Sequence, residues 1–382
     1  MDAKAATRAR MLAERDRLID LSHRIHANPE IAFEEERASH WVAEALAAAG
    51  FTVELGIYGL PTALRARSGS GPLQFAFCAE YDALPGIGHA CGHNLIAAMA
   101  VGAAIATAAV ADDLGVTVNV IGTPAEEVGD AGGKILLLER GAFDGMHAAM
   151  MVHPTPFDVA EPSLIAAAMF DVHYTGKEAH PVASPTEGIN AADALLIAQV
   201  AIGLLRQHLR PTDNIHGITT KGGDAPNIIP AHTAARYVMR ARSLDQLAEL
   251  RPRIVNCFQA GAVATGSTLE IVGGEKPYAE VTHDKDLASL YRRNAEALGR
   301  NFIESPMAAS TDMGNISRVM PTLHPSIGIG SLPAVNHQPA FAAHCATETA
   351  DQALFDGALA MAWTVIDVAT DETVRARLLA RS

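Results

Sequence analysis

The sequence predicts an α/β protein in which a mostly parallel sheet, with helices on both faces, is interrupted by a smaller ferredoxin-like domain of order β-α-β-β-α-β. The chain has 382 residues, more than one compact core usually contains. Short apolar runs alternate with helical segments up to about residue 152, and the order of elements changes after residue 164. We therefore expect a larger domain at 1–163 and 278–382 and an inserted domain at 164–277.

The elements of the larger domain are predicted from apolar spacing. A helical pattern over 34–49 stops at Gly50, a residue that favours the left-handed conformation after a helix. Another helix is expected directly after His93, in an alanine-rich stretch. Strand-like runs lie at 52–55, 63–66, 73–77, 116–121 and 148–152, and further helices at 134–140 and 347–368. Such alternation is typical of a parallel sheet.

The inserted domain follows a different order. Its strands are predicted at 165–174, 214–220, 231–242 and 269–272, and its helices at 189–209 and 244–264. This is the split pattern of ferredoxin-like domains. Because such a sheet has an exposed edge strand that can pair with a second copy, we expect a homodimer.

Composition and charge argue against several kinds of partner. Hydrophobic residues make up 49% and charged residues 19%, which is typical of a packed globular protein. The net charge of -14 argues against nucleic acid or an anionic membrane as a general partner. The N-terminus lacks the apolar core of a secretory signal, and the apolar stretch 95–110 is short for a membrane span. Four scattered cysteines suit a reducing compartment, so we expect a cytoplasmic protein with no membrane or nucleic-acid partner.

The segment 80–94 carries the strongest chemical signal. It follows a predicted strand and precedes a predicted helix, which places it at the carboxyl end of a sheet strand, where active sites of open α/β folds lie. Within it, Cys91 and His93 flank Gly92, and a thiolate with an imidazole suits zinc. The alternative is a buried cysteine beside an ordinary loop histidine, and this pair alone does not decide between the two.

A pair of carboxylates follows the next predicted strand. Glu126 and Glu127 come after the run at 116–121, and adjacent carboxylates there can serve as a general base and a metal ligand. The alternative is a solvated acidic turn. That alternative is weakened because the glycine-rich stretch that follows has no countercharge before Lys134.

Two histidines complete the set of strand-end side chains. His153 ends the apolar run at 148–152, and His337 lies in a loop after the apolar run at 326–329. One such histidine alone is more often structural than a ligand. The joint occurrence of all four segments favours a metal centre.

Together these segments resemble the aminoacylase and glutamate carboxypeptidase superfamily of di-zinc peptidases, and its amidohydrolase branch most closely. The resemblance extends from 23–30 to 337–341. It implies Cys91 as a bridging ligand and Glu126 as general base, and it implies four further metal ligands: His93, Glu127, His153 and His337. The implied cofactors are two divalent ions per subunit, zinc first, with manganese, cobalt or nickel as alternatives.

The same resemblance implies a reaction and a set of substrate contacts. The reaction is hydrolysis of the amide bond of N-acyl amino acids, aminobenzoyl-glutamate-type amides or dipeptides with a free carboxylate, by a metal-activated water. His180 would complete the active site of the partner subunit in the homodimer. The residues implied to contact the substrate are Asn227, Arg240, Ser310, Thr311 and Asp312.

The chain also departs from the superfamily pattern. Many members carry a His-x-Asp metal motif on the preceding strand, whereas this chain has 78–82 without a histidine, so His93 must serve instead. Asn94 stands where the amidohydrolase branch often has Asp. His344 and Cys345 compete with His337 as the last ligand, although the His-x-Pro-x-Phe context favours His337.

Two rival hypotheses remain. A cysteine hydrolase would use Cys91 with a nearby histidine, but it would leave Glu126, Glu127 and His153 without a role. The second rival hypothesis is a non-catalytic metal- or amino-acid-binding protein on the same scaffold. The complete ligand set together with Glu126 argues against it.

Overall fold

The computed structural model describes residues 2–304 and 308–381 and divides into two compact units. Unit 1 comprises Met1–Glu127, Gly132–Ser163 and Val281–Ser382, and unit 2 comprises Val128–Ala131 and Leu164–Glu280. The short segment Val128–Ala131 was not expected in the insert. It groups with unit 2 because the Met169 amide donates to the Gly129 carbonyl and the Ala131 amide to the Lys276 carbonyl.

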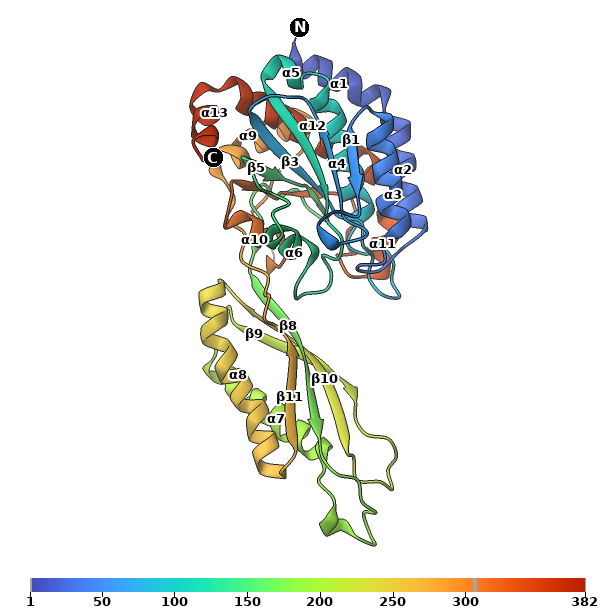
Figure 1. Ribbon diagram of the computed structural model, residues 1–382, viewed down its shortest axis with the longest axis vertical. Helices are drawn as coiled ribbons and strands as arrows, with labels where there is room; N and C mark the ends of the chain where they lie inside the picture. The colour runs from blue at the N-terminus through green and yellow to red at the C-terminus, as the bar shows by residue number, and fades with distance from the viewer. Residues whose placement is uncertain (1, 305–307, 382) are drawn as a thin grey trace. The chain divides into compact units, whose positions relative to one another are not determined.

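Unit 1 is built on a six-stranded sheet of order β1-β2-β4-β3-β5-β13 (Figure 1). Its strands are β1 (Thr52–Leu55), β2 (Leu64–Ser68), β3 (Leu73–Ala79), β4 (Val116–Gly122), β5 (Ala148–Met150) and β13 (Thr322–Leu323). The four strands β4, β3, β5 and β13 run parallel, whereas β1 and β2 are added antiparallel at one edge. β4 is buried along its whole length and β3 along nearly all of it, which explains why both are continuous apolar runs. The mostly parallel sheet expected from the sequence is confirmed.

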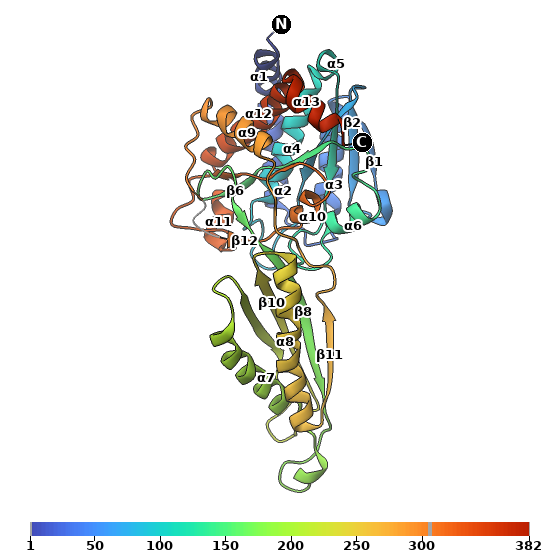
Figure 2. The same ribbon diagram turned by 90° about the vertical axis from the view of Figure 1, so that its left-hand side faces the viewer.

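Helix α4 (His93–Ala108) is the centre of the helical layer. It is buried at every position except the last, because small alanine side chains let β3 and β4 approach on one side and other helices on the others. The neighbours of α4 are α1 (Ala3–Ala13), α2 (Arg15–Ala27), α3 (Glu36–Ala48) and α12 (Glu348–Thr370). Figure 2 shows α9 (Lys285–Glu296) and α13 (Glu372–Leu379) beside α12.

Helix α12 has the composition of a core helix. Within the described part of the chain it is the one helix long and apolar enough to cross a membrane, but 89% of its most apolar window is buried in the protein.

The remaining α-helices and strands of unit 1 are short: α5 (Ala111–Leu114), α6 (Gly133–Glu139), α10 (Met313–Ser317), α11 (Pro339–His344), β6 (His153–Thr155), β14 (Ser326–Gly328) and β12 (Ala308–Ala309).

Unit 2 has the element order β-α-β-β-α-β, as predicted. After the two-residue strand β7 (Ser163–Leu164), which spans the boundary, its elements are β8 (Ala166–Thr175), α7 (Ala191–Leu205), β9 (Asn214–Lys221), β10 (His232–Ala241), α8 (Leu244–Thr265) and β11 (Thr268–Gly273). The antiparallel sheet has the order β11-β8-β10-β9, so β9 is an edge strand. Alternate residues of β8 and β10 are buried under α7 and α8, which lie together on one face of the sheet (Figure 1).

Candidate metal centre

The first part of the site is the turn that leads from β3 into α4. Gly92 has φ +79° and precedes the first residue of the helix, His93. A Cβ at Gly92 would lie 2.4 Å from Cγ of Pro154, so a side chain has no room there. The turn therefore requires glycine. It buries both Cys91 and His93.

The other expected ligands come from three further segments of unit 1. β4 ends at Gly122, and the chain then passes through Ala125, which has φ +57°, to Glu126 and Glu127. His153 is the first residue of β6. His337 also has positive φ, +67°, and its amide donates to the carbonyl of Ala90 at 2.8 Å, which ties this loop to the cysteine turn.

All five expected metal ligands converge. Cys91 Sγ is 3.5 Å from His153 Nε2 and 3.5 Å from His337 Nε2. His337 Nε2 lies 3.5 Å from Glu127 Oε1. Two groups result, Cys91 with His93 and His153, and Cys91 with Glu127 and His337, and in each the ligand atoms lie within 4.8 Å of one another. Ligands about 2.0–2.3 Å from a tetrahedral ion lie roughly 3.3–3.8 Å apart, so these separations fit two ions that share the thiolate.

Hydrogen bonds turn the correct imidazole nitrogens inward. His93 Nδ1 is 3.0 Å from Asp82 Oδ1, and His153 Nδ1 is 3.0 Å from the Pro154 carbonyl. Each acceptor favours a proton on Nδ1 and leaves Nε2 available to bind a metal ion. The second oxygen of Asp82 accepts the amide of Glu127 at 2.9 Å, so one carboxylate orients two of the expected ligands.

The electrostatics of the pocket differ between the two glutamates. Burial raises the pKa of Glu126 well above its ordinary value, and the neighbouring carboxylates of Glu80 and Glu127 raise it further. Burial also acts to raise the pKa of Glu127, but the neighbouring imidazole of His337 and the charge of His93 lower it more, and its net pKa is lowered. Glu126 is thus suited to take up a proton and Glu127 to stay ionised.

The pocket fits a metal ion on grounds of its own chemistry. Burial disfavours a charged His93, yet the Asp82 carboxylate outweighs it and raises the pKa of the imidazole well above its ordinary value. A field that stabilises an imidazolium also stabilises a bound cation. His93 Nε2 and Glu127 Oε1 are buried and have no hydrogen-bond partner among the described residues. Buried polar atoms are rarely left in this state, and a metal ion would satisfy both.

The expected substrate residues of unit 2 lie on its loops and sheet. His180 is exposed, and its Nδ1 accepts the amides of Val182 and Ala183. Asn227 is exposed in the loop between β9 and β10. Arg240 is half-buried on β10, opposite Ala167 of β8.

The expected substrate-side loop of unit 1 is only partly accessible. Ser310 is half-buried, and Thr311 and Asp312 are buried. Both oxygens of Asp312 are bonded to Lys134, one to its ammonium and one to its amide. The competing Cys345 donates its thiol to the carbonyl of Phe341 in the preceding helix α11, whereas His337 Nε2 lies 3.5 Å from Cys91 Sγ.

Sequence reasoning missed three buried residues beside the site. Asp82 orients His93, and Lys134 makes ion pairs with Glu80 and Asp312. The available signal was the spacing of Glu80 and Asp82, which are two residues apart at the end of a buried strand and so point to the same side. From the sequence, Lys134 marked only the end of a stretch without a positive charge. In the structure its ammonium balances the carboxylates of Glu80 and Asp312.

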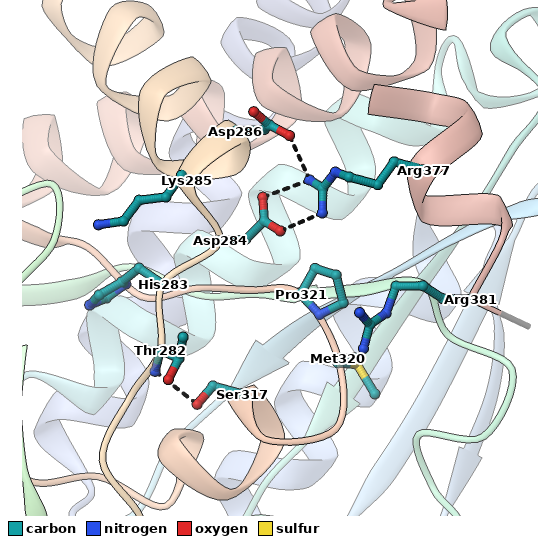
Figure 3. Close-up of a pocket in the computed structure, with 10 residues that line it drawn as sticks. All are labelled: Thr282, His283, Asp284, Lys285, Asp286, Ser317, Met320, Pro321, Arg377 and Arg381. Atoms are coloured by element: carbon teal, nitrogen blue, oxygen red, sulfur yellow. Dashed lines mark hydrogen bonds and ion pairs between the residues drawn. The ribbon is translucent and has the colours of Figure 1, made fainter. Parts of the chain in front are cut away.

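A hollow of about 390 Å³ on unit 1 contains none of the expected ligands (Figure 3). Arg377, one of its two arginines, is paired with Asp284 and Asp286. Its lining includes both acidic and basic side chains, which gives it no clear preference for a charged ligand.

The fold and this donor set define a metal-binding α/β hydrolase. Residues 76–354 match Peptidase family M20/M25/M40, which covers most of the chain, and the chain belongs to that family. The family is metal-dependent, and the chain is a metallo-amidohydrolase of the branch that the sequence resembles.

Named relatives support this assignment. The chain is 40% identical to the Xaa-Arg dipeptidase of Mus musculus, over 96% of this chain and 88% of the relative. It is 32% identical to one of the subunits of the p-aminobenzoyl-glutamate hydrolase of Escherichia coli, over 68% of this chain and 58% of the relative. A dinuclear metal-binding M20 peptidase from Bacillus subtilis shares the fold, with a TM-score of 0.68, 21% identity, and coverage of 93% of this chain and 98% of that chain.

Proposed function

We propose that this amidohydrolase uses two metal ions, with Glu126 as general base, to cleave dipeptides or N-acyl amino acids that carry a free α-carboxylate. The observation that carries the proposal is the pair of ligand groups that share Cys91. His93 and His153 would hold one ion with the thiolate, and Glu127 and His337 the other. Zinc suits this donor set best, with manganese, cobalt and nickel as alternatives.

The protein's own groups account for the proton transfers. Bound divalent ions would polarise the amide carbonyl and acidify the attacking water. The carboxylate of Glu126 accepts the proton of that water and delivers it to the leaving nitrogen, as its raised pKa favours. The hydrogen bond to Asp82 keeps the imidazole ring of His93 in one orientation throughout the reaction.

As the first candidate substrate, we propose a dipeptide with a basic C-terminal residue. The mouse and human relatives, each 40% identical to this chain, act by their names on Xaa-Arg dipeptides, and the net charge of -14 would attract a cationic substrate. Arg240 and Asn227 would bind the α-carboxylate, with Ser310 and Thr311 on the substrate side. Aminobenzoyl-glutamate is the second candidate, because a relative of that name also matches.

We further propose a homodimer in which His180 reaches the partner's active site. Edge strand β9 and the neighbouring helix α7 support this, since α7 exposes Leu196, Val200 and Leu204. Gln199 of α7 donates to Thr219 of β9, so strand and helix form one surface. An apolar helix face beside an open strand edge is suited to pairing with a copy of itself.

The test is hydrolysis of matched compounds by zinc- or manganese-loaded protein. Ala-Arg should be cleaved faster than Ala-Glu and aminobenzoyl-glutamate, and each free acid faster than its carboxamide. Arg240→Ala should lower kcat/KM for the acid by about 1.5–3 kcal/mol and remove most of the preference over the carboxamide, with Arg240→Lys as the matched control. Equal rates for acid and amide in the wild type would contradict carboxylate recognition.

A further inference from the structure

The carboxylate of Glu80 lies against the metal centre without being one of the expected ligands. Glu80 directly follows β3 and is fully buried. Its Oε1 is 2.5 Å from the Lys134 ammonium. Its Oε2 is 3.5 Å from Nε2 of His93, and neither of these two atoms has a hydrogen-bond partner among residues 2–304 and 308–381.

The separation of these two atoms is informative. A distance of 3.5 Å is longer than a normal hydrogen bond between nitrogen and oxygen. It matches the roughly 3.3–3.5 Å expected between two ligand atoms that bind one tetrahedral ion at about 2.0–2.2 Å. A buried carboxylate oxygen that faces an inward imidazole nitrogen at this distance is therefore placed as a ligand, and without a bound ion this oxygen has no partner of its own in the part of the chain that the structure describes.

We propose that Glu80 is an additional metal ligand, through Oε2, to the ion held by His93. This inference rests on the proposed two-metal function and adds a sixth protein ligand to it. The ion held by Cys91, His93 and His153 then gains a carboxylate, so both ions have one thiolate, at least one imidazole and one carboxylate.

Lys134 and Asp312 hold Glu80 in this position. Glu80, Glu126 and Asp312 form a buried acidic group whose oxygens lie within 4.8 Å of one another. The Lys134 ammonium bonds two of its members, so it already supplies the cation that such a group attracts. Burial opposes the charge on Lys134, but Asp312 and Glu80 outweigh it and keep its pKa well above the ordinary value. One oxygen of Glu80 is thus fixed on Lys134 and the other is directed at His93.

The role expected of Asp312 changes as a result. Its two oxygens bind Lys134, so it acts as a positioning residue for Glu80 and not as a direct contact of the substrate. Asp312→Asn therefore removes a charge from the same cluster without removing a ligand, and it is the matched control for Glu80→Gln.

The experiment measures zinc affinity and stoichiometry by competition with a chromophoric chelator. Wild type should bind two ions. Loss of an outer-shell partner typically costs about 10–100-fold in metal affinity, so Asp312→Asn should stay within that range. Glu80→Gln should weaken one of the two ions by more than about 100-fold and leave the other near the wild-type value.

Two results would overturn the assignment: unchanged affinities in Glu80→Gln, or equal losses in both variants. A crystal structure of the zinc-loaded wild type tests it without any variant. Glu80 Oε2 should lie about 2.0–2.2 Å from the ion, and a separation beyond about 3 Å would exclude coordination. Wild type that binds no metal at all would instead contradict the proposed function. Wild type with two ions and normal hydrolysis, but without the Glu80 effect, contradicts this inference alone.

Discussion

Glu126 and Glu127 are adjacent in the chain, yet their surroundings shift their pKa values in opposite directions. We predict that Glu126→Gln retains both metal ions and lowers kcat by at least about 10²–10⁴-fold, because the amide cannot accept a proton. Glu127→Gln should lower metal content instead, since it removes a proposed ligand beside His337. Elemental analysis and steady-state kinetics on the same preparations check both. Metal loss in the first variant but not in the second would reverse the two roles.

Glu35 is a second titrating carboxylate, located behind the acidic turn. Its Oε1 accepts the amide of Ala125 at 2.8 Å and its Oε2 accepts the hydroxyl of Thr62. Burial first, and then the charge of Asp82, raise its pKa from 4.5 to about 7. A carboxyl with a raised folded-state pKa favours the folded protein when protonated. The contribution of Glu35 to the free energy of unfolding is therefore complete below pH 4.5 and is lost as the pH rises through about 7.

Glu35→Gln should flatten this dependence. The amide can still accept from Ala125 and donate to Thr62, so at pH 8 the variant should be more stable than the wild type, by up to about 3 kcal/mol. At pH 4.5 the two proteins should be nearly equal. Urea unfolding at both pH values provides the comparison, because titrating groups that do not interact with Glu35 contribute equally to the two proteins. A difference that does not change with pH would show that Glu35 does not titrate in this range.

At the level of elements, the start of α4 depends on Gly92. Gly92→Ala combines positive φ with a contact of 2.4 Å to Pro154, the residue after His153. We predict a loss of about 2–4 kcal/mol in stability and weaker metal binding, because relief of the clash moves β6 or the helix start. Gly203→Ala in α7 is the control, since its Cβ would meet nothing within 4 Å and alanine favours helix. Thermal unfolding and metal content should separate the two variants.

Elements that lie in apolar runs of four or more residues were predicted from sequence, whereas the parallel pairing of the shortest strands was not. β3, β4 and α4 follow from apolar runs of five or more residues, and the order of unit 2 follows from its succession of strand-like and helix-like patterns. β6 and β14 have three residues each and pair parallel, and such a length carries no periodic signal. The convergence of Cys91, His93, Glu127 and His153 could be expected because each follows a strand or precedes a helix, and their role as metal ligands stays a prediction. Lys134 was missed because its partners Glu80 and Asp312 are 54 and 178 residues away in sequence. The roles of His180, Asn227 and Arg240 stay predictions.

At the scale of the whole molecule, the proposed dimer provides a test that does not depend on chemistry. Val200→Glu would place a charge in the exposed apolar row of α7 and should convert a dimer to monomers. Val263→Glu on α8 is the matched control, because Val263 is 84% exposed on the other helix. Sedimentation velocity measures the change.

A second test addresses the shared active site. When inactive His180→Ala and inactive Glu126→Gln subunits are mixed and allowed to exchange, part of the activity should return. A fully active wild-type monomer would contradict a shared site.

The grouping of Val128–Ala131 with unit 2 has a mechanical consequence. The chain passes between the units at four points, and two of these points bracket a four-residue segment that begins directly after Glu127. Any rigid-body rotation of one unit must be absorbed by backbone dihedrals at these points, as at a hinge. The position of the Glu127 carboxylate, a proposed metal ligand, and any motion of the two units would therefore be coupled through a single peptide bond. Amide hydrogen exchange in Val128–Ala131 should slow when metal is added, because an ion that fixes Glu127 also restrains this end of the hinge.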